Sequence, residues 1–526
     1  MKRRRRFLRL ANIAALAILA APWLMPAPAD SRTLRYATTS FGEENLDPTV
    51  TSITASLGIA GPLWDWLTEV AADGKLQPAL ATGWKLSGDG LSWVFRLRQG
   101  VKFHDGRELT AEDVQFTLME AFRRPEAKSS RAVQFRKGIK DVKAVDRYTV
   151  SVQTASPWPT FPHDVSNQPG IEGIVLPKHY VQKVGWAGFA KRPIATGPWK
   201  FVRHDVGHVV EFEAWKEHWK TPPSFDRLHI LLVPEAATRI AMLRTGQLDM
   251  ADVSLDEVPE VERGGLKLAE DPQPTSVRIH LYGTYYENAG PIRDVRVRQA
   301  LNLAINREEM VRTLFRGKGK AAAVFPPSSI SIGYPRALKP YPYDPQRAKK
   351  LLAEAGVANG FSIKLFSLAT GGFAQFQQVA EAVAGYWSAI GVRASIVPSD
   401  MGAFRPLYMA SPQSAQVVGQ ASVFATTGRL NGADDLHIWW TKDAKITQLA
   451  DNVEDVAKKA VAGRSVEEIA QTVEKAYQIL YKEYRSVPIA DVSGTLWAYG
   501  NQVADVRVRP HRGYITPSLA TATAGR

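Results

Sequence analysis

The chain has 526 residues, of which 45% are apolar and 22% are charged, proportions typical of globular proteins. This length exceeds what one compact core accommodates, and the composition excludes disordered, fibrous and coiled-coil proteins. Cysteine is absent. This excludes a disulfide framework, a thiolate zinc site, a cysteine nucleophile and a lipid anchor on cysteine.

The amino-terminal residues have the pattern of an export signal. Six basic side chains within residues 1–9 precede the uncharged segment Leu10–Met25, and small residues follow at 26–29. A basic region, then a short apolar region, then small residues before a cleavage site predict a cleaved signal peptide over 1–29. The arginines also resemble the twin-arginine pattern, with the Sec route as the alternative. Without this segment the net charge falls from +14 to +8, and the charges are interspersed, which does not support nucleic-acid binding.

The first half of the mature chain predicts hairpins and helices. Strands are expected at Leu34–Thr38 and Leu91–Arg98, where apolar residues partly alternate. Thr110 and Asp113 form a capping-box pattern that starts a helix. Gly197–Glu213 contains two runs rich in Val, Phe and Trp around a glycine turn, which predicts a hairpin.

The second half predicts an α/β lobe. Phe361–Leu368 and Val392–Val397 have strand character and flank a helix-like segment, Phe373–Ile390. Strand, helix and strand in this order predict a parallel crossover. Further helices are predicted to begin at three N-cap residues: Asn306, Asp344 and Ser465.

A search for catalytic chemistry finds no nucleotide-binding glycine loop, no zinc-protease motif and no serine-hydrolase elbow. His204 and His208 are four residues apart, but they flank a hairpin turn, where this spacing does not define a metal-binding helix face. Asp434 and Asp435 are candidates for binding a cation or an amine, with solvated loop residues as the alternative. A secreted hydrolase is therefore disfavoured.

Aromatic residues provide a second set of candidates. Tyr282, Tyr285 and Tyr286 lie where the first half gives way to the α/β half. Small ligands often bind at such junctions, and packing between domains explains the tyrosines equally well. For Trp64 and Trp66 the expected role is core packing.

Ordered motifs cover nearly the whole mature chain. They comprise Pro78–Trp84 with Asp89-Gly90, Phe95–Gly106 with Leu109–Val114, Ala195–Trp199, Gly246–Asp249, Arg293–Arg307 and Tyr343–Gly356. Together these segments resemble the extracellular solute-binding proteins of family 5, the peptide/nickel-type receptors of ABC importers.

The resemblance implies an α/β, two-lobed periplasmic-binding-protein fold of type II with an extra inserted domain and a hinge that closes on a ligand. It implies a discontinuous first lobe (31–75, 195–272 and 489–526), an inserted domain (76–194) and a second lobe (273–488), with crossings near Pro272 and Pro488. It further implies a monomeric periplasmic receptor without catalytic residues, metal site or cofactor, which presents a small-molecule or peptide ligand to a transmembrane permease.

The resemblance also identifies where this chain departs from its family. Peptide-binding members carry an aspartate in a second-lobe segment like G-W-x-x-D, which pairs with the amino terminus of the peptide. The matching segment here, 417–432, contains neither an acid nor a tryptophan. Asp434 or Asp435 could replace the missing acid, whereas Arg429 offers donors suited to a carboxylate or phosphate. The candidate ligand-binding residues are Glu44, Tyr282, Tyr285, Met401, Phe404, Phe424, Arg429, Asp434 and Asp435.

The expected function is capture of an oligopeptide or peptide-like small solute for an ABC importer. The alternatives are an anionic opine-like or sugar-acid solute and, third, a nickel chelate.

Overall fold

The computed structural model describes residues 32–506 except 51–57, 72, 129–131, 169–170, 272–273, 327–328, 370–374, 411–412, 442–450, 494–495 and 505. The predicted signal peptide, 1–29, lies outside the described residues, as does the end of the predicted first-lobe tail. Within the described part of the chain, no helix combines the length and apolarity that a membrane crossing requires.

A seven-stranded sheet brings together distant parts of the chain. Its order is β12-β19-β11-β1-β10-β9-β8, and β1 runs parallel to both of its neighbours, β10 and β11. Its strands are β1 (Thr33–Thr38), β8 (Trp199–Asp205), β9 (Val209–Ala214), β10 (Arg227–Leu232), β11 (Met250–Val253), β12 (Lys267–Glu270) and β19 (Leu496–Tyr499). Two helices, α6 (Ala236–Arg244) and α7 (Val258–Arg263), follow its strands.

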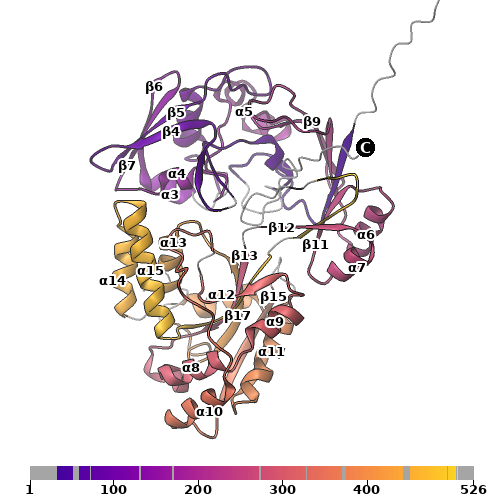
Figure 1. Cartoon of the computed structure of the whole chain (residues 1–526). Helices are drawn as coiled ribbons and strands as arrows, with labels where there is room; N and C mark the ends of the chain where they lie inside the picture. The colour runs from indigo at the N-terminus through magenta and orange to yellow at the C-terminus, as the bar shows by residue number, and fades with distance from the viewer. Residues whose placement is uncertain are drawn as a thin grey trace, which may run out of the picture.

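A four-stranded antiparallel sheet, β4-β5-β7-β6, lies in the same upper body of the molecule (Figure 1). Its strands are β4 (Ala81–Leu86), β5 (Ser92–Leu97), β6 (Ile139–Asp146) and β7 (Thr149–Thr154), and β2 (Thr68–Val70) pairs with β3 (Leu76–Pro78) nearby. The helices of this region are η1 (Gly61–Leu63), α2 (Ala111–Phe116), η2 (Thr117–Ala121), α3 (Ala132–Gly138), α4 (Phe161–Asp164) and α5 (Lys178–Lys191).

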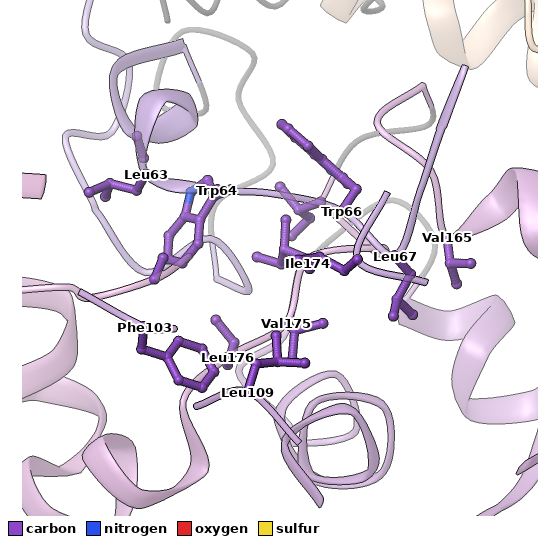
Figure 2. Close-up of a cluster of buried hydrophobic side chains, with 14 of the residues drawn as sticks. Leu63, Trp64, Trp66, Leu67, Phe103, Leu109, Val165, Ile174, Val175 and Leu176 are labelled. Carbon is purple, nitrogen blue, oxygen red and sulfur yellow. The ribbon is translucent and has the colours of Figure 1, made fainter. Parts of the chain in front are cut away.

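One hydrophobic core joins these two sheets. Trp64 and Trp66 are buried, as expected for core residues. Figure 2 shows them with Phe103 and with the side chains of Ile174 and Leu176, which come from separate segments of the chain. The four-stranded sheet is therefore attached to the first sheet through shared apolar burial.

The lower body in Figure 1 is built on a six-stranded sheet of order β14-β18-β13-β17-β15-β16. Its strands are β13 (Pro274–Leu281), β14 (Gly319–Ala321), β15 (Ser362–Ala369), β16 (Arg393–Asp400), β17 (Ala421–Thr427) and β18 (Ser486–Ser493). The parallel pairing of β15 with β16 confirms the predicted crossover, whose helix is α11 (Phe376–Ser388).

Helices cover both faces of this second sheet. On the face of Val277 and Ile279, the core includes side chains from η3 (Glu287–Arg293), α8 (Val295–Leu303), α9 (Arg307–Thr313), α10 (Pro345–Glu354) and α11. On the face of Phe366 and Phe424, it includes side chains from α12 (Met401–Met409), α13 (Gly432–Trp440), α14 (Asp451–Val461) and α15 (Val466–Lys482).

The predicted helix starts are confirmed by their caps. Asn306 accepts a hydrogen bond from the backbone of Glu309, and Ser465 accepts one from Glu468. Asp344 accepts from the backbone of Arg347 with a proline at the first turn, and the capping box at Thr110 is formed. These side chains satisfy backbone N–H groups that have no partner within their helices.

The chain passes between the two sheets twice, after Glu270 and after Ser493. The second passage lies later than the expected crossing near Pro488, because β18 continues its pairing with β13 to Ser493. Residues 489–493 therefore belong to the second sheet. The remaining domain boundaries stay predictions.

The two bodies also meet away from these passages. Gly74 has φ +85°, and a Cβ at this position would lie 3.0 Å from the carbonyl oxygen of Ile330. Gly74 precedes β3 in the upper body, whereas Ile330 lies in the connection between β14 and α10. A glycine is required here because both the backbone angle and the close approach exclude a side chain.

Candidate functional site

One edge of the second sheet lies where the chain passes to the first sheet. The parallel strands β15 and β16 end there at Ala369 and Asp400, and β17 ends there at Thr427. β13 begins and β18 ends at the same edge, where Pro274 pairs with Ser493. Open α/β sheets bind their ligands beyond the carboxyl ends of their strands, which makes this edge the candidate site.

The first sheet has its corresponding edge at the same passages. The parallel strands β1, β10 and β11 end at Thr38, Leu232 and Val253. Leu496, the first residue of β19, pairs with both Val253 and Glu270. The strand ends of both sheets are therefore directed towards the connections between the two bodies.

Four of the predicted site residues lie in the segments that follow β16 and β17 at the edge of the second sheet. Met401 is the first residue of α12, immediately after β16. Arg429 lies two residues after β17, and Asp434 and Asp435 lie in the first turn of α13.

Arg429 and Asp435 form an ion pair rather than offering free charges. The Arg429 Nη1 lies 3.1 Å from Asp435 Oδ1, and the Arg429 backbone N–H donates to Oδ2 at 2.8 Å. The side chain of Asp435 is fully buried, and that of Arg429 is 24% exposed. Asp434 instead accepts a hydrogen bond from the Asn431 amide at 3.3 Å. The pair neutralises both charges that were expected to bind a solute.

Aromatic members of the predicted site are buried together. Tyr282, Phe404 and Phe424 belong to one core cluster beneath α12–α15, and Met401 packs against it. The Tyr282 hydroxyl lies 2.8 Å from the Ser422 hydroxyl, and burial raises the pKa of Tyr282. These side chains therefore form the wall behind the edge rather than an exposed stacking surface.

The remaining two predicted residues lie outside this cluster. Tyr285 packs on Tyr286 with ring centroids 4.6 Å apart. Glu44 belongs to the upper body, where its Oε2 lies 2.8 Å from His204 Nε2 and accepts from the Gly207 backbone at 2.9 Å. His204 therefore binds a carboxylate, and no group of three metal-ligating side chains occurs among the described residues.

Two acids at the sheet edges were not predicted. Asp252 on β11 accepts hydrogen bonds from Tyr36 through Oδ1 and from Thr38 through Oδ2, the latter at 2.6 Å. Both of its carboxylate oxygens therefore have donors. Asp491 on β18 accepts a hydrogen bond from the Ser276 hydroxyl through Oδ1. Burial raises the pKa of Asp491 to about 6, against the opposing effects of Ser276 and Lys320.

A basic residue on the same sheet face was also missed. Asp491 pairs with Ser276 across the β13–β18 ladder, and Arg278 lies two residues further along β13. Alternate residues of a strand share a face. The alternation of Val277, Ile279 and Leu281 with polar residues is the local signal that could have identified β13 and its polar face.

Comparison with known proteins agrees with this geometry. Residues 75–421 match the model of the bacterial extracellular solute-binding proteins, family 5 Middle. The dipeptide-binding protein of Escherichia coli is 29% identical over 410 residues, 72% of this chain and 74% of that protein. The heme-binding protein A of Haemophilus influenzae is 31% identical over 63% of each chain. The chain thus spans less than two thirds of this latter relative.

Solved structures show the same fold. The substrate-binding protein CtaP of Listeria monocytogenes superposes with a TM-score of 0.79 at 20% identity, covering 93% of this chain and 99% of that chain. The predicted two-lobed periplasmic-binding-protein fold is therefore confirmed. This chain belongs to the bacterial extracellular solute-binding proteins of family 5, a family of solute receptors rather than enzymes.

Proposed function

We propose that this protein captures a short peptide or a peptide-like solute with a free amino group, and that Asp491 binds the ammonium of that solute. The observation that carries this proposal is the carboxylate of Asp491 at the sheet edge, where its Oδ1 accepts from Ser276. An ammonium donates up to three hydrogen bonds, and its burial requires a carboxylate partner.

The other acids of the site are already engaged. Asp435 is held by Arg429, and Asp252 accepts hydrogen bonds from Tyr36 and Thr38. Asp491 has a second carboxylate oxygen and no ion pair within the described ranges. Asp491 thereby provides the acid that segment 417–432 lacks.

The names of related proteins support a peptide-like ligand. Relatives include the dipeptide-binding protein and a glutathione-binding protein of Pectobacterium atrosepticum that is 30% identical over 360 residues. Dipeptides and glutathione share a free α-amino group and carboxylates. We further propose that residues 1–29 direct export to the periplasm, that the protein serves an ABC importer, and that its monomeric, solute-bound form engages the transmembrane permease of that importer.

Equilibrium binding of chemically matched ligands tests this function. Calorimetry would compare a defined library of di- and tripeptides, the same library N-acetylated, and opine-type acids. We expect the free peptides to bind and to be recovered unaltered, with N-acetylation weakening binding at least about 10-fold because a charge-assisted hydrogen bond is lost.

A matched pair of variants locates the effect. Asp491→Asn should reduce the preference for free over acetylated peptides, whereas Asp434→Asn should leave it unchanged. Equal binding of both libraries by the wild-type protein, or binding of opine acids alone, would refute recognition of a peptide amine.

A further inference from the structure

Most of the described buried arginines donate hydrogen bonds to several oxygen acceptors. Of the described arginines, four are buried: Arg239, Arg278, Arg298 and Arg307. Arg307 donates to the carbonyl oxygens of Pro488 and Asn302 at 2.6 and 3.0 Å and to the Asn302 side chain at 2.9 Å. Such bonds compensate for the loss of hydration of a guanidinium.

Two of the others follow the same rule. Arg298 donates to the carbonyl oxygens of Glu483 and Ile292 at 2.9 and 3.0 Å. Arg239 donates to the carbonyls of Asp252 and Val233 at 3.0 and 2.9 Å, in addition to its ion pair with Glu257. These arginines tie loops and strands together and need no external anion.

Arg278 is the exception among these four. Its side chain is fully buried, and its single hydrogen bond runs from Nε to His280 Nδ1 at 3.2 Å. Both terminal nitrogens, Nη1 and Nη2, are buried without an acceptor. Burial without an acid at bonding distance lowers the pKa of this guanidinium.

Aromatic rings surround Arg278 instead of acceptors. Its guanidinium carbon lies 4.3 Å from the ring centroid of Trp439 and 4.8 Å from that of Phe424, and the ring of Phe325 also contacts it. Ring faces attract a cation but offer no lone pair to N–H groups in the guanidinium plane. Trp439 Nε1 and His280 Nε2 are likewise buried without a partner.

We propose that Arg278 is the anion-binding residue of the solute site and that it binds a carboxylate of the solute. This inference rests on the proposed function, because it places the second charged group of the same solute. The planar fork of Nη1 and Nη2 matches a planar carboxylate in two parallel hydrogen bonds. Trp439 Nε1 is a further donor of this buried subsite.

The two proposed subsites lie on the same face of the second sheet. Ser276, which pairs with Asp491, and Arg278 are two residues apart on β13, and alternate residues of a strand share a face. The ammonium subsite at Asp491 and the carboxylate subsite at Arg278 are therefore neighbours along β13.

The test compares three forms of one dipeptide library: free, C-terminally amidated and N-acetylated. With wild-type protein, we expect amidation to weaken binding roughly 10- to 150-fold. This factor corresponds to the free energy of a hydrogen bond to a charged group. Arg278→Met should weaken binding of the free library by a similar factor and leave the amidated library unchanged. Arg347→Met, on the exposed side of α10, is the matched control and should change neither.

Unfolding measurements separate recognition from a structural role. Arg278→Met should keep or raise the melting temperature of the unliganded protein, because it removes a buried charge without acceptors. Arg307→Met should lower it, because it leaves carbonyl groups unpaired. Trp439→Phe keeps the ring and removes Nε1, and it should weaken binding of the free library alone.

The three libraries distinguish this inference from the proposed function. Equal wild-type affinity for the free and amidated libraries overturns the role of Arg278 and leaves amine recognition intact. Tight binding of the N-acetylated library together with weak binding of the amidated library supports Arg278 and contradicts amine recognition at Asp491. A large loss of melting temperature in Arg278→Met with unchanged library preference also overturns the inference.

Discussion

The carboxylate of Asp435 binds both the backbone and the side chain of Arg429. The backbone N–H donates to Oδ2 at 2.8 Å, and Nη1 lies 3.1 Å from Oδ1. The arginine is thus fixed at the end of β17 while α13 begins. Because these two charges bind each other, we propose Asp491 and Arg278 in their place as the residues that recognise the solute.

This pairing predicts unequal effects at neighbouring positions. Arg429→Met leaves the buried Asp435 without its cation. We expect this to lower the free energy of unfolding by about 2–4 kcal/mol. This is near the lower end of the range for broken buried ion pairs, because Arg429 is partly exposed. Asp434→Asn keeps its hydrogen-bonding capacity and should change stability by less than about 0.5 kcal/mol. Urea denaturation measures both, and equal effects at the two positions would contradict the structural role.

The raised pKa of Asp491 predicts a dependence of stability on pH. Unfolding returns this carboxyl from a pKa of about 6 to roughly 3.9. Between these values the folded state binds more protons, so Asp491 reduces stability as pH rises from about 4 to 6. Asp491→Asn should therefore melt at a higher temperature than wild type above pH 6, and the difference should vanish near pH 4. Calorimetric scans across this range that show no convergence would argue against a raised pKa of Asp491.

Peptide affinity should also follow the ionisation of Asp491. The groups that influence it are Ser276, which donates to it, and the charge of Lys320. Tyr334 stays neutral in this range, because burial and the charge of Asp491 raise its pKa to about 12. A peptide ammonium stays protonated to about pH 7.7, so affinity should rise between pH 5 and 7 as Asp491 loses its proton. Calorimetric titrations at fixed ionic strength measure this rise. Asp491→Asn should show a flat profile, and a flat wild-type profile would contradict the assignment.

Two glycines, one preceding β15 and one within α11, should respond to alanine with opposite signs. Gly360 has φ +73°, and its added Cβ would lie 1.8 Å from the Gly391 carbonyl oxygen. Gly360→Ala should cost about 2–4 kcal/mol. Gly385 lies within α11 with nothing within 4 Å of an added Cβ, and Gly385→Ala should gain about 0.5–1 kcal/mol. Chemical denaturation of both variants checks the signs.

Features carried by neighbouring residues were predictable from the sequence. The caps at Asn306, Asp344 and Ser465 each depend on a residue three positions further on. The crossover around α11 pairs Ser362 with Arg393, 31 positions apart. The family motifs then implied the overall fold. The crossing near Pro488 was misplaced because the length of β18 depends on its pairing with β13, more than 200 residues away in the chain.

The site depended on contacts between distant segments. Arg429 and Asp435 looked available because the sequence does not reveal that they bind each other. Asp491 and Arg278 were missed because only strand register places Asp491 opposite Ser276 and Arg278 two residues further along β13. The burial of Arg278 depends on rings from β17 and α13, far away in the chain. Only the assembled core shows which charged side chain has no hydrogen-bond partner.

We propose that one peptide-like solute is held at the edge of the second sheet through its two charged ends. A crystal structure of the protein with a bound free dipeptide tests this most directly. We predict an unaltered peptide whose ammonium lies within hydrogen-bonding distance of Asp491 and whose carboxylate contacts the terminal nitrogens of Arg278. A peptide bound with both ends on other residues, or a cleaved product in the density, would contradict the claim.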